Sequence, residues 1–224
     1  MRRKIGIFGG TFDPVHIGHL RLALELKQQL GLDEMRLLPC HRPPHRAAPQ
    51  VSSGQRVEML HLALQSCPDL LLDERELQRD KPSYTVDTLR EVRAEVGEEV
   101  SLVLCMGEDA FAGLPGWHCW RELLGLAHIV VVARPGWTLA ETGKIGEARE
   151  PGAAGELREL LLKHQCDAES LACAAAGAIV LQAPRLLAIS SSEIRQQIKA
   201  GESAQFLVSD AVWEFITQHN LYSE

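Results

Sequence analysis

The fold of this chain is decided by one stretch, residues 9–19, which reads GGTFDPVHIGH. The apolar residues 4–8 precede it and have the composition of a buried parallel strand. From Ile17 onward, apolar residues recur with a period close to 3.6 and predict a helix that Gly31 closes as a C-cap. A strand, a glycine-rich turn and a helix in this order predict an α/β protein.

The residue types in this turn indicate a site for phosphate. Glycines allow backbone N–H groups to approach a phosphate closely, and the start of a helix favours negative charge. His16 and His19 are three residues apart, so within a helix they share one face, with about 5–6 Å between their Cβ atoms. Tight packing alone explains a pair of glycines, and a solvated cap explains one histidine. The glycine pair together with both histidines is hard to explain by packing and predicts a binding site for a polyphosphate.

The composition is that of a single globular domain, residues 1–224, with 46% hydrophobic and 24% charged residues. The net charge of −7 argues against non-specific binding of nucleic acid, so an anionic ligand requires a local cluster of positive groups. The longest apolar run, Leu171–Leu181, is too short to span a bilayer. The six cysteines show neither a C-x-x-C pair nor a zinc-ligand spacing, which predicts a reducing, cytoplasmic setting and no metal held by the chain itself.

Strand-like and helix-like segments alternate along the chain, which predicts a Rossmann-like, doubly wound parallel sheet. The predicted strands are residues 4–8, 35–39, 70–73, 100–105, 128–133 and 178–181. The predicted helices are residues 17–30, 54–66 with Ser53 as N-cap, a helix opened by Ser83 or Tyr84, and residues 191–200 and 210–219. We predict an irregular surface over residues 136–157 and a partly helical stretch over residues 157–176.

In open parallel sheets, ligands bind beyond the carboxyl ends of the strands. Gly9, Gly107 and Asp109 follow two of the predicted strands and are therefore expected at one edge. Asp109 either holds a ribose hydroxyl or caps the next helix. Arg134 follows a third strand, where its guanidinium can form paired hydrogen bonds with a phosphate.

Three further segments carry candidate ligand groups. Tyr84 and Thr85 fall in the first turn of a predicted helix, whose N–H groups can bind a carboxylate or phosphate, although spacing alone favours a cap role for Thr85. Trp117 lies in a Pro-Gly-Trp-His turn and either packs internally or stacks on a flat substrate. The basic, proline-rich loop 40–53, which contains His45, is either a solvated connection or a flap over an anion, and its length favours the flap.

A second helix start of the phosphate-binding type lies late in the chain. Ser190 and Glu193 form a capping-box pattern, which makes Ser191 one of the first helical residues. Its hydroxyl and the first N–H groups lie at a positive helix end, and Arg195 follows about one turn later. The plain alternative is an ordinary capped helix that ends at Gly201.

Four segments, taken in order, resemble the nucleotidylyltransferase superfamily and, within it, the bacterial nicotinate-nucleotide adenylyltransferases. They are residues 9–19, 81–89 (KPSYTVDTL), 106–117 and 189–195. The resemblance spans nearly the whole chain. Ser192 stands where that family usually has threonine, which keeps the hydroxyl and removes a methyl group.

The resemblance implies transfer of the adenylyl group of ATP to nicotinate mononucleotide, giving deamido-NAD and pyrophosphate, with Mg²⁺ as cofactor. The implied partners are these small molecules, without nucleic acid or membrane, and a homo-oligomer is compatible with the sequence. The implied catalytic residues are His16, His19 and Arg195. The implied ATP-binding residues are Gly9, Thr11, Phe12, His16, His19, Gly107, Asp109, Ser190, Ser191 and Arg195, with residues 189–224 completing the ATP site. The implied acceptor-binding residues are Tyr84, Thr85, Trp117, His45 and Arg134.

Other functions stay open at this point. A sister transferase would use nicotinamide mononucleotide or phosphopantetheine, although those enzymes lack or vary the Ser-Tyr-Thr-x-Asp-Thr segment. Residues 16–19 also match the His-Ile-Gly-His tetrad of class I aminoacyl-tRNA synthetases, but the chain has no Lys-Met-Ser-Lys-Ser segment. A nucleotide sensor without catalysis is the non-enzyme alternative, and the intact histidine pair with Arg195 argues against it.

Overall fold

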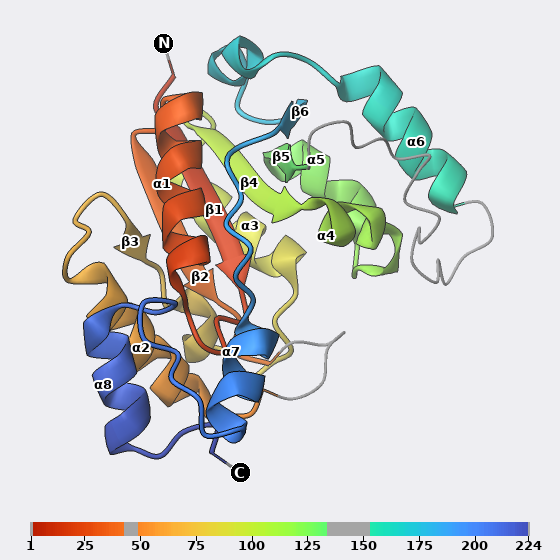
Figure 1. Ribbon diagram of the computed structural model, residues 1–224. Coiled ribbons are helices and arrows are strands. Elements are labelled where there is room, and N and C mark those ends of the chain that lie inside the picture. The colour runs from red at the N-terminus through yellow and green to blue at the C-terminus, as the bar shows by residue number, and fades with distance from the viewer. Residues whose placement is uncertain (1, 43–48, 134–152, 224) are drawn as a thin grey trace. The chain divides into compact units, whose positions relative to one another are not determined.

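The computed structural model describes residues 2–42, 49–133 and 153–223. Within these residues, six strands form one sheet in the order β3-β2-β1-β4-β5-β6 (Figure 1). Their bounds are β1 Lys4–Gly10, β2 Glu34–Pro39, β3 Leu71–Leu72, β4 Ser101–Gly107, β5 His128–Val132 and β6 Ile179–Gln182. The pairs β1/β4, β2/β3, β4/β5 and β5/β6 run parallel. This is the strand order of a Rossmann-type sheet, which confirms the predicted fold class.

Helical segments follow the strands, because parallel neighbours need long crossover connections. The α-helices are α1 Ile17–Leu30, α2 Ser53–Leu64, α3 Thr85–Val96, α4 Glu108–Ala112, α5 Leu123–Leu126, α6 Ala153–His164, α7 Ser191–Lys199 and α8 Asp210–Gln218. Short 3₁₀ turns are η1 Arg75–Gln78, η2 Leu114–Gly116, η3 Trp120–Glu122 and η4 Ala168–Ala172. Gly31 has a φ of +58°, as expected of the residue that ends α1.

The core lies along the central strands. Every residue of β5 is buried, and so is every residue of β4 except Gly107. Such uninterrupted burial is typical of parallel strands covered on both faces. Helix α3 buries Val86, Leu89 and Val92, the apolar face predicted for it. Since β1 and β4 are parallel with Phe8 opposite Cys105, their carboxyl ends lie at the same edge, as predicted.

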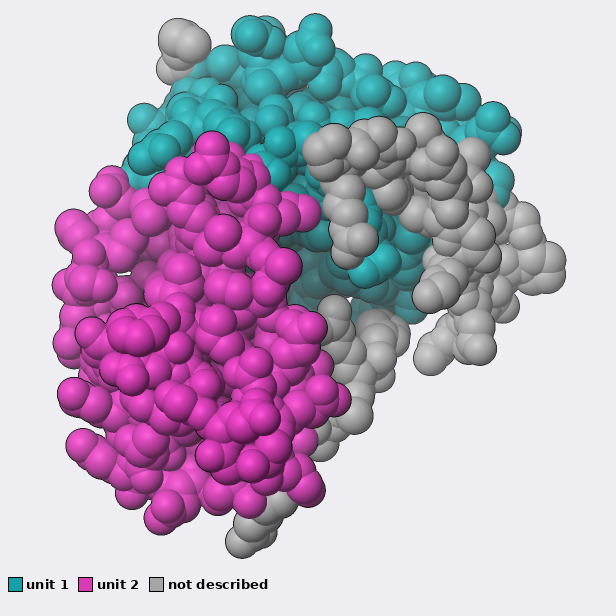
Figure 2. Space-filling model, in the orientation of Figure 1, with its two compact units in different colours: residues 1–8, 27–33, 84–184 teal, residues 9–26, 34–83, 185–224 magenta. Residues whose placement is uncertain are grey.

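The chain forms two compact units, each built from separate stretches of sequence (Figure 2). Unit 1 comprises residues 1–8, 27–33 and 84–184, and contains β4, β5 and β6 with α3 to α6. Unit 2 comprises residues 9–26, 34–83 and 185–224. It contains the turn after β1, and its helices α2 and α8 pack against each other. The single domain 1–224 expected from composition stays a prediction.

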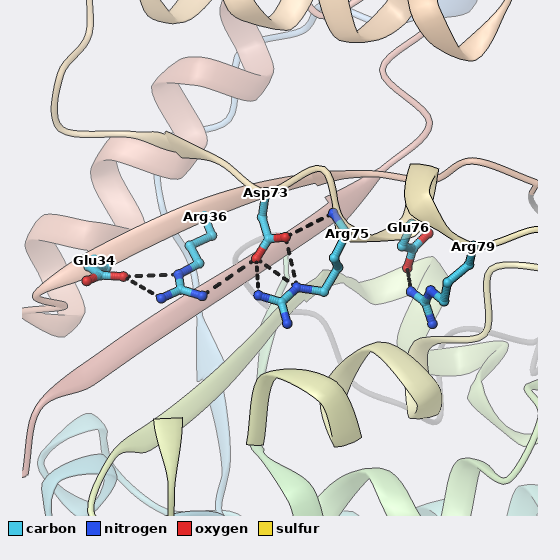
Figure 3. Close-up of polar contacts among 6 residues, drawn as sticks. All are labelled: Glu34, Arg36, Asp73, Arg75, Glu76 and Arg79. Atoms are coloured by element: carbon cyan, nitrogen blue, oxygen red, sulfur yellow. Dashed lines mark hydrogen bonds and ion pairs between the residues drawn. The ribbon is translucent and has the colours of Figure 1, made fainter. Parts of the chain in front are cut away.

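A chain of charged side chains in unit 2 fastens the two-residue strand β3 to its neighbour β2 (Figure 3). Arg36 lies 3.0 Å from Glu34 and 3.6 Å from Asp73, and Arg75 lies 2.8 Å from Asp73. Burial alone would raise the pKa of Asp73, but hydrogen bonds and charge from Arg75 and Arg36 lower it below its ordinary value. The Asp73 carboxylate therefore stays charged and holds both arginines at this end of the sheet.

Two predicted boundaries were wrong. The N-cap of α2 is Ser52, not Ser53, because the Ser52 hydroxyl accepts from the Gln55 N–H and the Gln55 side chain accepts from the Ser52 N–H. The Ser53 hydroxyl instead donates to a carbonyl of the preceding loop. Helix α6 begins at Ala153, inside the stretch predicted to be irregular, because Leu157 and Leu161 form a buried stripe. Most of that stretch, residues 136–152, lies outside the described residues.

Candidate active site

The turn after β1 is shaped by an aromatic side chain that folds back under it. Phe12 is 2% exposed and has a φ of +51°, which directs its ring into the core. A Cβ on Gly10 would lie 2.9 Å from this ring, so only glycine fits there. A Cβ on Gly9 would meet no atom closer than 4.0 Å. Gly9 therefore keeps an accessible backbone at the start of the turn, as a phosphate-binding glycine requires.

His16 and His19 cap the start of α1 by reciprocal hydrogen bonds. Helix α1 begins at Ile17, so His16 is not inside the helix as predicted but stands directly before it. The His16 Nδ1 accepts from the His19 N–H at 3.3 Å, and the His19 Nδ1 accepts from the His16 N–H at 3.3 Å. The two rings stack with their centroids 3.6 Å apart. The arrangement has the form of a capping box made by imidazoles.

Burial sets the charge of both rings, and these hydrogen bonds set which nitrogen carries the proton. Burial lowers the pKa of His16 to about 4. Burial, and then the neighbouring His16, lowers the pKa of His19 well below its ordinary value. Both imidazoles are therefore neutral at neutral pH. Because each Nδ1 is an acceptor, each ring carries its proton on Nε2 and can donate there.

A second helix start meets the same turn from the far end of the sequence. A Cβ on Gly18 would lie 3.0 Å from the His16 ring and 3.6 Å from Ile189, so the segment before α7 lies against α1. Ser190 is the N-cap of α7, as predicted, and its hydroxyl accepts from the N–H of Glu193. The structure thus brings the two predicted phosphate-type helix starts together within unit 2.

Ser191 and Arg195 bind directly to the backbone of the turn. The Ser191 hydroxyl donates to the Pro14 carbonyl at 3.0 Å. The Arg195 Nη1 donates to the Asp13 carbonyl at 2.6 Å and lies 3.9 Å from the Asp13 carboxylate. The Arg195 side chain is 22% exposed, and its Nη2 donates to the Ser192 hydroxyl at 3.3 Å. The second helix start thus brings a positive charge to the turn before α1.

Arg56, which is not among the residues predicted from the sequence, supplies a second positive charge to this turn. It is 1% exposed, and its guanidinium donates to the Thr11 carbonyl at 2.6 Å and to the His41 carbonyl at 3.3 Å. The sequence carried a signal for it, because Arg56 precedes Val57 and Leu60 on the buried face of α2. A charged residue on the apolar face of a helix needs internal partners, which the turn provides.

Three of the predicted acceptor residues, Tyr84, Thr85 and Trp117, lie in the described part of unit 1. Tyr84 is the N-cap of α3 and makes no side-chain cap hydrogen bond, and Thr85 is the first helical residue. The Tyr84 ring packs on His118 with a centroid distance of 4.4 Å. Trp117 follows η2 and is half-buried, whereas the nearby Trp120 is only 5% exposed and belongs to the core. The indole of Trp117 is thus partly accessible.

Gly107 and Asp109 lie at the carboxyl end of β4. Gly107 is exposed and is the N-cap of α4. The alternative that Asp109 caps this helix is therefore wrong. Asp109 instead lies exposed in the first turn of α4. Among the described residues, no atom lies within 4 Å of a Cβ placed on Gly107. His45 and Arg134 lie outside the described residues.

Comparison with known proteins assigns the chain to a family. Residues 7–197 match the family described as cytidylyltransferase-like. A protein of Cellvibrio japonicus named "Probable nicotinate-nucleotide adenylyltransferase" is 59% identical over 222 residues, which cover 99% of this chain and 100% of that protein. A protein of Pseudomonas aeruginosa PAO1 with the same name is 46% identical, over 99% of this chain and 98% of that protein. The chain belongs to the nicotinate-nucleotide adenylyltransferases.

Solved structures support the fold of this nicotinate-nucleotide adenylyltransferase chain. A Plasmodium falciparum nicotinic acid mononucleotide adenylyltransferase complexed with NaAD aligns with a TM-score of 0.69 and 16% identity, over 98% of this chain and 97% of that one. The same enzyme complexed with APC aligns with a TM-score of 0.64. At this level of identity the likeness establishes the shared fold of this family member and no more.

Proposed function

We propose that this chain transfers the adenylyl group of ATP to nicotinate mononucleotide and releases pyrophosphate and deamido-NAD. The observation that carries the proposal is the meeting of two helix starts at one turn, with His16 and His19 on the first and Ser191 and Arg195 on the second. The names of the curated relatives support the same reaction.

The triphosphate is assigned to unit 2. The backbone of Gly9, Thr11 and Phe12 approaches the nucleotide, and the Nε2–H groups of His16 and His19 donate to phosphate oxygens. Neutral donors add no positive charge, so Arg195 supplies the charge that balances the polyanion. Ser190 and Ser191 place the positive end of α7 beside the same phosphates. This cluster stabilises the charge that develops on the transferring phosphoryl group and on the leaving pyrophosphate.

The acceptor is assigned to unit 1. The first turn of α3 offers backbone N–H groups that Tyr84 does not cap, and we assign them, with Thr85, to the carboxylate of the nicotinate ring. The half-buried indole of Trp117 stacks on the pyridine ring. Gly107 and Asp109, at the end of β4, are assigned to the ribose or adenine of ATP.

His45 and Arg134 are assigned to the acceptor or its phosphate from the family resemblance alone. Both belong to basic segments, which suits an anionic nucleotide.

The reaction needs alignment more than proton transfer. The attacking phosphate of nicotinate mononucleotide is already an anion at neutral pH, so no general base has to activate it. Two polyanions must be held in line against their mutual repulsion, and pre-oriented donors achieve this. The reciprocal capping of His16 and His19 fixes both rings before ATP arrives, so little reorganisation is required during the reaction.

Mg²⁺ is the cofactor we propose, carried in by the phosphates of ATP. In residues 2–42, 49–133 and 153–223, no three His, Cys, Asp or Glu side chains gather closely enough to hold a metal ion. The Asp13 carboxylate already accepts hydrogen bonds on both oxygens. The residues of the turn therefore suit a metal bound mainly by phosphate oxygens, whose charge it neutralises.

We further propose a cytoplasmic setting, small-molecule partners and no nucleic acid, with a homo-oligomer as an option. All six cysteines lie in the described part of the chain, and each is a free thiol, as a reducing compartment favours. Among the described residues, no helix has the length and apolar character that crossing a membrane requires.

A pyrophosphate-release assay tests the proposed reaction. Purified protein with ATP and Mg²⁺ receives nicotinate mononucleotide, nicotinamide mononucleotide or phosphopantetheine. We expect nicotinate mononucleotide to give the highest kcat/KM, by at least about tenfold over the amide, because N–H donors suit a carboxylate and leave an NH₂ group poorly paired. Equal kcat/KM for acid and amide would contradict the assigned acceptor. Turnover with phosphopantetheine alone would indicate the sister activity, and no turnover with any acceptor would indicate a nucleotide sensor.

His19→Ala should reduce kcat roughly 10²–10³-fold, as loss of one charge-stabilising donor does elsewhere. His219→Ala, which removes an exposed histidine after α8, is the matched control and should keep the wild-type rate. An unchanged rate in His19→Ala would remove this residue from the mechanism.

A further inference from the structure

Tyr222 reaches the phosphate-binding turn although it lies 209 residues away from it in sequence. After α8 the chain reverses through Asn220 and Tyr222, both at positive φ, and buries Leu221 and Tyr222 to 8% and 6% exposure. The Tyr222 hydroxyl donates to the Asp13 Oδ1 at 2.8 Å. Burial raises the pKa of this hydroxyl, so it keeps its proton and remains a donor.

Asp13 connects this tyrosine to Arg195. Its Oδ1 accepts from Tyr222, its Oδ2 accepts from the Gln50 N–H at 3.0 Å, and its backbone carbonyl accepts from Arg195. The Arg195 guanidinium lies 3.9 Å from the carboxylate, beyond hydrogen-bond distance. The Asp13 carboxylate thus accepts hydrogen bonds from two neutral donors, while Arg195 donates to the Asp13 backbone carbonyl.

Asp13 is 5% exposed, so water cannot replace a protein donor that its carboxylate loses. A buried carboxylate that loses a donor seeks the nearest alternative, and hydrogen bonds to charged groups are the stronger ones. The Arg195 guanidinium is a charged donor 3.9 Å from this carboxylate, and its side chain is 22% exposed. Without the Tyr222 hydroxyl, Asp13 would compete with the triphosphate for this guanidinium.

We propose that Tyr222 is a positioning residue for adenylyl transfer, which satisfies Asp13 so that the Arg195 guanidinium stays available to the triphosphate of ATP. The inference rests on the proposed function, because it takes the turn as the triphosphate site. Tyr222 itself touches no reacting atom. Its effect is therefore expected on ATP affinity and turnover, and not on affinity for the acceptor.

A double-mutant cycle tests this role. Tyr222→Phe keeps the buried ring and removes only the hydroxyl. We expect the Kd for ATP, measured by calorimetry without acceptor, to rise about tenfold, and kcat/KM for ATP to fall by a similar factor. The KM for nicotinate mononucleotide should stay within twofold of wild type. In an Arg195→Ala background, Tyr222→Phe should change the Kd for ATP by less than twofold, because the group through which it acts is gone.

Controls separate positioning from simple loss of structure. Ser223→Ala removes a hydroxyl from the same segment, one that donates to the nearby Asn220 carbonyl, and should match wild type in every parameter. Thermal unfolding shows whether Tyr222→Phe is folded at the assay temperature. If this variant unfolds, the double variant Tyr222→Phe with Asp13→Asn serves in its place. The neutral amide no longer attracts Arg195, so the Kd for ATP of the double variant should equal that of Asp13→Asn.

The outcomes distinguish the two proposals. Wild-type affinity for ATP in Tyr222→Phe, or the same tenfold loss with and without Arg195, would overturn the positioning role. Wild-type protein that binds ATP but does not release pyrophosphate with any acceptor would overturn the proposed function while the binding cycle still decides the role of Tyr222. Failure of the wild type to bind ATP would overturn both.

Discussion

Acidification should destabilise this protein through the buried pair of histidines at the start of α1. Burial lowers the pKa of His16 to about 4, whereas an unfolded chain titrates near 6.5. The folded state therefore prefers the neutral ring, and below pH 6.5 the unfolded state binds more protons. Stability is fully present above pH 6.5, declines as the pH falls, and levels off for this residue below about pH 4.

The magnitude follows from the two pKa values. The interval between about 4 and 6.5 corresponds to roughly 3 kcal/mol at about 1.36 kcal/mol for each pH unit. Between pH 7.5 and pH 5.0, this linkage removes about 2 kcal/mol of unfolding free energy through His16 alone. His19 acts in the same direction, because burial and the neighbouring His16 lower its pKa as well.

The assay is urea unfolding at pH 7.5 and pH 5.0, with His16→Asn as the comparison. Asparagine is a favoured N-cap residue and offers an acceptor to the His19 N–H, but it does not titrate. Ionisable groups away from this helix start contribute alike in both proteins, so their effect cancels in the difference. His19 does not cancel, because His16 lowers its pKa only in the wild type, and its contribution adds in the same direction. We expect wild type to lose about 2 kcal/mol more than the variant between the two pH values. An equal loss in both proteins would refute the idea that the fold holds His16 as a neutral imidazole.

Two further predictions concern other parts of the chain. Trp117→Ala should raise the Kd for nicotinate mononucleotide at least about tenfold by calorimetry and leave the Kd for ATP unchanged, because an indole stack is lost; equal acceptor affinity would exclude stacking. Ser52→Ala should lower the unfolding free energy by about 1 kcal/mol in urea, because α2 loses its N-cap. An unchanged unfolding free energy in Ser52→Ala would contradict the observed cap.

Much of the fold could be predicted because its signals are local. Continuous apolar runs located the strands, and the period near 3.6 located α1, α3 and α8 within a residue or two. The error at α2 arose because Ser52 and Ser53 are the same residue type, and only the position of Gln55 relative to each decides which of them caps. The start of α6 was not predicted because glycine and small residues at the start of this segment obscure the helical spacing of its two buried leucines.

The candidate site was predictable only where its residues form a contiguous motif. Glycine, histidine and capping patterns allowed residues 9–19 and 189–195 to be predicted as parts of the site. Arg56 and Tyr222 could not be placed in that way, since their partners lie 45 and 209 residues away in sequence. The neutral state of His16 was also invisible, because it depends on burial and on a reciprocal hydrogen bond that spacing does not reveal.

The assembly of unit 2 from three separate stretches has a consequence during synthesis on the ribosome. Its last stretch, residues 185–224, includes α8, which covers α2, and α7, which meets the turn after β1. A nascent chain that ends before this stretch has made α2 but lacks the helix α8 that packs against it. Unit 2 can therefore complete its fold only after residues 185–224 have been translated, and products truncated before this stretch should be prominent clients of chaperones and proteases.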